Sequence, residues 1–242
     1  MLYRARKGQM SYGRPIGILM LEEHLPCPPG TPANATTFAH PVCYEIVKGV
    51  DISSLAALNQ PDSLQAFLDA GRVLVDKGVA AITGNCGLMI VHQEAMANAL
   101  PVPVLMSSLV QLPLIARMLG SERSVGIMAS SRNNLKPEHI RIAAAGAEIR
   151  TIVASMDGQA HFRAIFGEGV LDFEKVEAEI VEVAKEMVAE HPEVGAILFE
   201  CTDLPPYAHA VQEATGLPIF DITTLINFAI SGIVRRPFAG IY

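Results

Sequence analysis

With 242 residues, half of them apolar, the chain is long enough for one large or two small α/β domains and too hydrophobic to be disordered. The formal net charge is −7 and the Lys and Arg residues are scattered, which argues against a nucleic-acid partner. No run of about 18 uncharged apolar residues occurs, so we expect no membrane span. The apolar run 16–21 is too short, and too close to Glu22 and Glu23, for a secretory signal.

Short apolar runs alternate with helical signals along the chain. Such a run, bounded by turn residues, is typical of a strand buried on both faces of a parallel sheet. Apolar residues at helical spacing, capping residues such as Asp172 and closing glycines such as Gly78 indicate helices. The expected elements are strand 16–21, strand 44–47, helix 61–77, strand 79–84, helix 88–100, strand 102–107, helix 111–119, strand 124–129, helix 135–145, strand 149–154, helix 172–190, strand 194–200, helix 205–215, strand 217–221 and helix 223–234.

This alternation predicts an α/β fold with mainly parallel sheets. The pattern begins again near residue 120, which indicates two similar halves. We therefore predict two pseudo-symmetric, Rossmann-like lobes, with residues 1–119 and 219–242 in the first and residues 120–218 in the second. Because ligands bind at the carboxyl ends of parallel strands, the active site is expected in the cleft between the lobes.

Two of the expected strands end in a cysteine. Cys86 follows strand 79–84 and Cys201 follows strand 194–200, and their separation of 115 residues is close to half the chain. At the start of a helix, free N–H groups and the helix dipole lower a thiol pKa and attract anions. A thiolate on one face of a carbon atom can remove a proton while a thiol on the other face returns one. The pair therefore predicts inversion of a stereocentre without a cofactor.

The other two cysteines, Cys27 and Cys43, are expected to be packed thiols. No cysteine pair has C-x-x-C spacing, no H-E-x-x-H motif occurs, and no phosphate-binding glycine loop follows a strand. We therefore expect no metal, no cofactor and no disulfide framework, and a reducing cytoplasm as the location.

The thiol-bearing segments 84–87 and 200–203, together with segment 219–224, resemble the aspartate/glutamate racemase superfamily, and the resemblance covers most of the chain. That group includes glutamate and aspartate racemases, hydantoin racemases and arylmalonate decarboxylases. The proline-rich loop 22–41 and Tyr44 are similar to the hydantoin racemase and arylmalonate decarboxylase side. The resemblance implies two lobes with the active site between them, no cofactor, and Cys86 and Cys201 as the acid–base pair.

Polar groups near the two thiols are expected to hold a substrate carboxylate. The resemblance implies this role for the backbone at Gly87 and for the hydroxyl residues that follow two strands. Asn85 lies at the same strand end as Cys86, and Tyr44 either reaches the substrate or is a core tyrosine with a satisfied hydroxyl. The complete expected set is Asn85, Gly87, Ser130, Ser131, Thr202, Thr36, Thr37 and Tyr44.

The residues on either side of Cys201 carry two carboxyl groups. Glu200 precedes Cys201 on the expected strand and should therefore point to the opposite face. Asp203 either orients the thiol or caps the helix that follows. In amino-acid racemases of the superfamily Asn-Thr usually follows the first cysteine, whereas Gly87 and Leu88 stand there in this chain.

The predicted function is that of an isomerase, a cofactor-independent racemase or epimerase that abstracts a proton next to a carboxylate. The superfamily leaves two alternatives open: a cysteine-dependent carbon–sulfur lyase similar to dimethylsulfoniopropionate lyases, in which abstraction ends in β-elimination, and a decarboxylase. A third alternative, from another class, is a non-catalytic protein that binds a small anion. The expected partner is a small carboxylate-containing substrate, and the high apolar fraction is compatible with a homo-oligomer.

Overall fold

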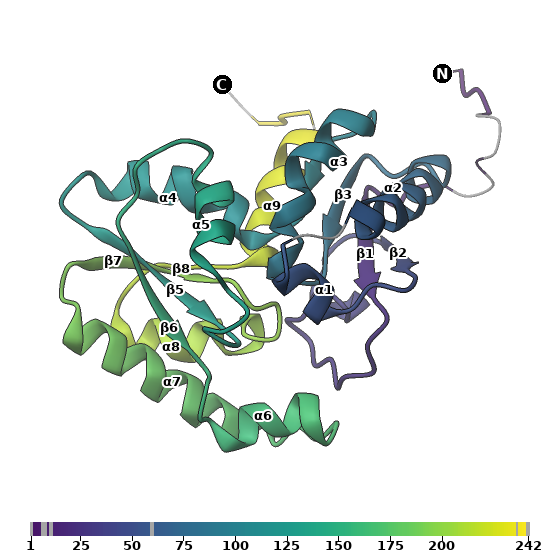
Figure 1. Cartoon of the computed structure of the whole chain (residues 1–242). Coiled ribbons are helices and arrows are strands. Elements are labelled where there is room, and N and C mark those ends of the chain that lie inside the picture. The colour runs from purple at the N-terminus through teal and green to yellow at the C-terminus, as the bar shows by residue number, and fades with distance from the viewer. Residues whose placement is uncertain (1, 6–8, 10–11, 59–60, 236, 241–242) are drawn as a thin grey trace.

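The computed structural model describes residues 2–5, 9, 12–58, 61–235 and 237–240. Its described strands form two four-stranded sheets in which every pairing is parallel, and Figure 1 shows the sheets in separate halves of the molecule. The predicted α/β fold with two parallel-sheet lobes is confirmed. The first sheet has the order β2-β1-β3-β4, with β1 Ile16–Leu21, β2 Val42–Val47, β3 Ala81–Gly84 and β4 Val104–Leu105. The second has the order β6-β5-β7-β8, with β5 Ser124–Ala129, β6 Thr151–Ser155, β7 Val194–Phe199 and β8 Ile219–Phe220.

Helices cover both sheets, so the central strands are apolar throughout. Every residue of β5 and β7 is buried, as expected for strands packed on both faces. The described α-helices are α1 Ile52–Ala56, α2 Pro61–Asp76, α3 Gln93–Ala99, α4 Leu112–Leu119, α5 Pro137–Ala144, α6 Ala160–Gly167, α7 Phe173–Glu190, α8 Ala208–Thr215 and α9 Ile222–Ile233. Short 3-10 helices are η1 Ala35–Thr37, η2 Gly87–His92, η3 Ser108–Gln111 and η4 Pro205–Tyr207.

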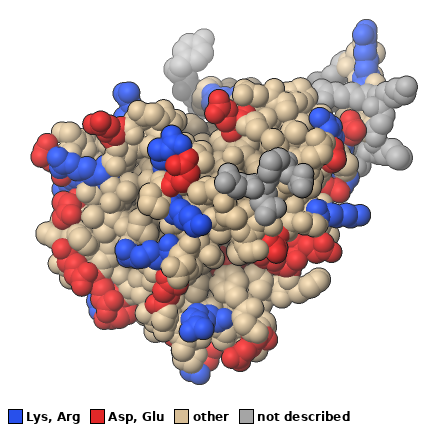
Figure 2. Space-filling view, in the orientation of Figure 1, with Lys and Arg blue, Asp and Glu red and all other residues tan. Residues whose placement is uncertain are grey.

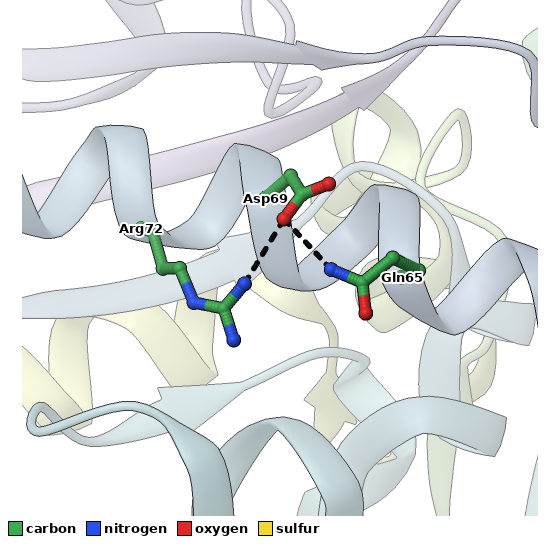
Figure 3. A network of polar contacts seen from close by, with 3 residues as sticks. All are labelled: Gln65, Asp69 and Arg72. Atoms are coloured by element: carbon green, nitrogen blue, oxygen red, sulfur yellow. Dashed lines mark hydrogen bonds and ion pairs between the residues drawn. The ribbon is translucent and has the colours of Figure 1, made fainter.

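The outer face of α2 carries a small polar network (Figure 3). Asp69 Oδ1 accepts a hydrogen bond from Gln65 Nε2 at 2.8 Å and pairs with Arg72 Nη1 at 3.0 Å. Pairs spaced three and four residues apart stabilise a helix by a few tenths of a kcal/mol each. On the opposite side of α2, Phe67 and Leu74 are fully buried, so this helix is anchored mainly by its apolar face.

The last helix returns from the second sheet to the first. Strand β8 pairs with β7, but α9 packs its residues Ile222, Leu225 and Ile226 in one cluster with Ile16 and Ile18 of β1. The chain therefore crosses between the halves near Asp221. The predicted division at residues 119 and 218 stays a prediction.

The chain departs from the predicted elements between residues 87 and 107. Predicted helix 88–100 is divided into η2 and α3, and predicted strand 102–107 is reduced to two residues. The strand is short because the Gln93 side chain replaces the next rung: its Nε2 donates to Val104 O at 2.9 Å and its Oε1 accepts from Met106 N at 2.9 Å. Helices α1 and α6 were not predicted.

The surface mixes charges of both signs. On the face in Figure 2, Lys and Arg side chains are interspersed with Asp and Glu. Within the described part of the chain, no helix combines the length and apolar character needed to cross a membrane.

Candidate active site

One pocket brings both predicted cysteines together. It is lined by residues from the first half and from the second half, at the carboxyl ends of β1, β3, β5 and β7, and has an empty volume of about 340 Å³, part of it open to solvent. Its lining residues are Glu23, Ile52, Asn85, Cys86, Gly87, Leu88, Ser130, Phe166, Glu200, Cys201, Thr202 and Asp203. Roles for these residues are not established by their positions alone, so the acid–base role of the pair stays a prediction.

Cys86 directly follows β3 and is the residue before η2 begins. Its backbone is extended, with φ −145° and ψ 133°, and its side chain is almost wholly buried. The preceding residue fixes this loop to β1, because Asn85 N donates to Leu19 O and Asn85 Oδ1 accepts from Leu21 N, both at 3.0 Å. Thr202 Oγ1 donates to Asn85 O and so joins the two thiol-bearing loops.

Cys201 lies in the equivalent loop after β7. Its Sγ donates to Asp203 Oδ2 at 3.6 Å, which supports the orienting alternative for Asp203. The loop is held from the first half by Ser108, whose hydroxyl donates to Phe199 O at 2.7 Å. Both thiols therefore lie in loops that are fixed by hydrogen bonds between the two halves.

Glu200 lies in the pocket with Cys201, so the expectation that it points to the opposite face is wrong. Strand β7 ends at Phe199, and the alternation of a strand does not extend to the next residue. The Glu200 carboxyl group reaches across to Gly87: a Cβ atom at residue 87 would lie only 2.6 Å from Glu200 Cδ and would clash with Glu200 Oε1. The absence of a side chain at Gly87 therefore makes room for Glu200.

The charged residues that line the pocket are all acidic: Glu23, Glu200 and Asp203. Burial, followed by the nearby Asp203 carboxylate, raises the pKa of Glu200 to about 8, and burial raises the pKa of Asp203 to about 6. Burial also raises the pKa of Glu23, with a further contribution from Asp203. At neutral pH Glu200 is therefore mainly protonated and Asp203 mainly ionised.

Both thiols have a raised pKa, and the expectation of lowered values is wrong. Burial is the main cause for each; the Glu200 carboxylate adds to it at Cys86, and the Asp203 carboxylate adds to it at Cys201. The backbone N–H groups of Leu88 and Asp203 favour the thiolates, as the sequence predicts, but they are outweighed. The empty pocket thus holds two thiols rather than a thiolate.

The remaining predicted binding residues lie at different distances from the thiols. Ser130 lines the pocket, whereas the Ser131 hydroxyl accepts from Asn133 N at 3.2 Å. In the proline-rich loop, Thr36 donates to Asn34 Oδ1 at 2.6 Å and Thr37 donates to Thr31 O at 2.7 Å. Tyr44 donates to Pro32 O at 3.0 Å, so its hydroxyl is satisfied by the loop.

The proline-rich loop forms the wall of a second, adjoining pocket. This pocket includes Cys27 and shares Glu23, Asn85, Thr202 and Asp203 with the first. A larger surface depression lies elsewhere, between α4 and the loop before β6, and is lined by Arg117, Arg123 and Arg150 with no thiol. We place the candidate site at the two thiols because only there do buried, titratable groups converge.

Four pocket residues were missed from the sequence: Glu23, Ile52, Phe166 and Glu200. Glu23 had a usable signal, because it follows the carboxyl end of β1 in a parallel sheet. Ile52 and Phe166 lie on α1 and α6, the two helices that were not predicted. A search of the described residues found no set of three His, Cys, Asp or Glu side chains placed to hold a metal ion.

Solved structures with the same fold identify its class. A glycine-to-cysteine mutant of arylmalonate decarboxylase aligns with a TM-score of 0.61 at 16% identity, covering 93% of this chain and 97% of that one. A putative Asp/Glu racemase from Yersinia pestis aligns with a TM-score of 0.59 at 17% identity, covering 91% and 99%. The fold is that of the aspartate/glutamate racemase superfamily, as the sequence resemblance indicated. No family model matches the chain.

Curated relatives define the group more closely. A dimethylsulfoniopropionate lyase of Durusdinium sp. clade D is 33% identical over 232 residues, which are 93% of this chain and 77% of that protein. Dimethylsulfoniopropionate lyase 3 of Emiliania huxleyi (strain CCMP1516) is 31% identical over 235 residues, 93% of this chain, and the chain spans 61% of its length. This chain belongs to the dimethylsulfoniopropionate lyase family.

The comparison corrects the predicted function. The racemase or isomerase assignment is wrong, because the relatives that match across 93% of the chain at about 30% identity are lyases. The two-cysteine pattern does not distinguish the two reactions, since proton abstraction next to a carboxylate is common to both. What differs is the fate of the carbanion, which the spacing of the thiols does not report.

Proposed function

We propose that this protein is a carbon–sulfur lyase that cleaves a β-sulfonio carboxylate such as dimethylsulfoniopropionate. The enzyme base takes a proton from the carbon next to the carboxylate, and that C–H electron pair becomes the new double bond. The C–S bond breaks and its electron pair leaves on sulfur. The products are a neutral dialkyl sulfide, an acrylate and the proton held by the base, so no oxidant, reductant or cofactor is consumed.

The observation that carries the proposal is the joining of two thiols and three carboxyl groups around one pocket. A sulfonium group is a permanent cation, and Glu23, Glu200 and Asp203 line the pocket without a lysine or arginine among the lining residues. Opposite charges at short range attract strongly in a partly buried site. This environment favours a cationic substrate over the purely anionic one first expected.

A cationic substrate also removes an obstacle to catalysis. The thiols of the empty pocket have raised pKa values, because burial and neighbouring carboxylates oppose the thiolate. A sulfonium group placed between them would offset the carboxylate charge and lower both thiol pKa values. Formation of the base would then be coupled to binding of the correct substrate.

Cys201 is the better candidate for the base. Its thiol already donates to the Asp203 carboxylate, whose pKa of about 6 leaves it mainly ionised at neutral pH. Asp203 therefore orients the thiol and stabilises the proton that leaves it. Cys86 belongs to the other thiol-bearing loop of the same pocket and completes the pair.

The carboxylate end of the substrate is assigned to the polar groups predicted from the sequence. Ser130 and the backbone at Gly87 line the pocket, and Asn85 and Thr202 join its two loops. Thr36, Thr37, Tyr44 and Ser131 remain predictions without support from the pocket. The cytoplasmic location suggested by the free cysteines is part of this proposal.

The direct test measures dimethyl sulfide release from dimethylsulfoniopropionate by headspace gas chromatography. Cys201→Ser should lower the rate by about 10²–10⁴-fold, the usual contribution of a general base. Cys86→Ser should also lower it, and a larger loss there than in Cys201→Ser would assign the base to Cys86. Cys43→Ser is the matched control, because Cys43 is buried in β2 and does not line the pocket.

Wild-type protein that releases no sulfide would contradict the proposed function. So would full activity in both single serine variants. Unfolding midpoints of all variants show whether a loss of activity comes from a loss of structure.

A further inference from the structure

Glu200 is the side chain that links the two thiol-bearing loops. It directly precedes Cys201, yet its carboxyl group lies on Gly87, next to Cys86. Only 3% of the residue is exposed. Its backbone is fixed by the bond from Glu200 N to Met128 O at 2.8 Å, so the carboxyl group cannot easily withdraw from the pocket.

The surroundings of Glu200 offer it no positive partner. Its carboxyl group accepts from the backbone N–H of Ser130, which follows β5. The titratable groups that share its pocket come from the loops after β1, β3 and β7. They are Glu23, Cys86, Cys201 and Asp203, all of which are neutral or negative.

We propose that Glu200 is a positioning residue that must be an uncharged acid for the two thiols to ionise, and that Gly87 is the glycine that lets it reach them. A negative charge at this place would lie next to Cys86 and one residue from Cys201, and would oppose the formation of either thiolate. A neutral carboxyl group keeps the same shape and the same bond to Ser130 without that penalty.

The direction of the titration follows from this placement. Burial and Asp203 raise the pKa of Glu200 to about 8, so the group is neutral when the protein is at neutral pH. As the pH rises through this value Glu200 ionises, and the pKa of each thiol rises further. Reactivity of the thiols in the wild type should therefore lag behind the pH.

The test uses Glu200→Gln, which has the size of the protonated acid but cannot ionise. Iodoacetamide alkylation of Cys86 and Cys201 is followed by peptide mass spectrometry between pH 6 and pH 10. At pH 9 we expect both thiols of the variant to react roughly tenfold faster than in the wild type, which corresponds to a shift of about one pKa unit. Cys27 and Cys43 serve as internal standards in the same samples, because both are expected to react at unchanged rates.

Two controls keep the outcome decisive. Glu94→Gln makes the same chemical change on the exposed surface of α3, away from the pocket, and should leave the alkylation profile unchanged. Glu200→Asp keeps the charge on a shorter side chain and should retain the lag seen in the wild type. Coinciding profiles for wild type and Glu200→Gln, including no reaction of either thiol, would overturn the inference.

This inference rests on the proposed function only in assigning the reaction to these two thiols, and alkylation requires no substrate. If dimethylsulfoniopropionate is not cleaved but Glu200→Gln shifts the profile, the proposed function fails and the role of Glu200 stands. If cleavage occurs and the profiles coincide, the role of Glu200 fails alone. A variant with no structural damage should also retain dimethyl sulfide release at pH 7 within a few fold.

Discussion

Gly87 shows how the space beside a reactive group can be more informative than the group itself. The sequence identifies it as a departure from the Asn-Thr that follows the first cysteine in amino-acid racemases. In the structure the space that a side chain would need is filled by the Glu200 carboxyl group. The departure at residue 87 and the acid at residue 200 are therefore two parts of one arrangement.

Gly87→Ala should lower lyase activity by at least tenfold. The added methyl group would clash with the carboxyl and carbonyl oxygens of Glu200, so Glu200 or the Cys86 loop must move. Displacements of this size at a reacting centre commonly cost about a hundredfold in rate. Initial rates of dimethyl sulfide release measure the effect.

Gly232→Ala is the matched control for this substitution. A Cβ atom at Gly232 in α9 would meet no atom within 4 Å, so activity should be unchanged. Equal activity of Gly87→Ala and wild type would show that the close approach of Glu200 is irrelevant to the reaction.

At the scale of elements, long apolar signals were predictable and short ones were not. Strands 16–21 and 124–129 were predicted with the observed bounds, and Asp172 caps α7 as expected, with Lys175 N donating to its Oδ1 at 3.3 Å. Helices α1 and α6 were missed because each has at most eight residues and depends on packing rather than on a periodic pattern.

The pocket was predictable to the extent that it follows from strand ends. Both thiols, Asn85 and Ser130 were expected there because parallel strands deliver their carboxyl ends to one edge. Glu200 was placed on the wrong face because one residue separates the end of β7 from the loop, and sequence patterns do not locate such boundaries to one residue. The raised thiol pKa values were missed for a related reason, since burial is a property of the folded pocket.

Asp221 controls the element that returns to the first half. Its Oδ1 accepts from Thr223 N at 2.7 Å and from Thr224 N at 2.9 Å, which caps α9, and its carbonyl oxygen accepts from Gln111 Nε2 at 2.8 Å. Asp221→Ala should lower the free energy of unfolding by about 1–2 kcal/mol, the usual effect of losing a helix cap. Urea unfolding followed by circular dichroism measures this loss.

The matching variant is Asp221→Asn, which retains an oxygen that can accept the same backbone bonds. It should cost only a few tenths of a kcal/mol, since asparagine and aspartate cap helices about equally well. Equal destabilisation by alanine and asparagine would mean that the capping bonds are not what fixes α9.

The whole molecule repeats one plan twice. Each sheet has its first strand between the second and the third, and each cysteine follows the third strand of its half. The two thiols therefore arise from equivalent positions and meet in a pocket lined by both halves. This repetition accounts for their separation of about half the chain.

Buried acids should make the whole protein less stable as the pH rises above neutrality. The pKa of Glu200 is raised from 4.5 to about 8, so the folded state holds this proton more tightly than the unfolded state. Its contribution to stability is complete below pH 4.5 and is lost as the pH rises through about 8. Between pH 7 and pH 9, above the ordinary pKa of histidine, the unfolding free energy of the wild type should fall by about 1.4 kcal/mol on this account.

Glu200→Gln should remove that part of the pH dependence, as measured by urea unfolding at several pH values. The slope that remains reports the other groups, including the thiols, whose raised pKa values act in the same direction. A wild-type stability that is constant or rises over this interval would contradict the assignment of a neutral, buried Glu200.

The central claim is that the two-thiol pocket removes a proton from a sulfonium carboxylate and releases the sulfide. Proton NMR of dimethylsulfoniopropionate incubated with the protein in deuterated water follows cleavage and hydrogen exchange in one experiment. The account predicts that acrylate and dimethyl sulfide appear in equal amounts with wild type and are lost with Cys201→Ser. Unchanged substrate after incubation with folded wild-type protein, or cleavage that continues without either thiol, would contradict it.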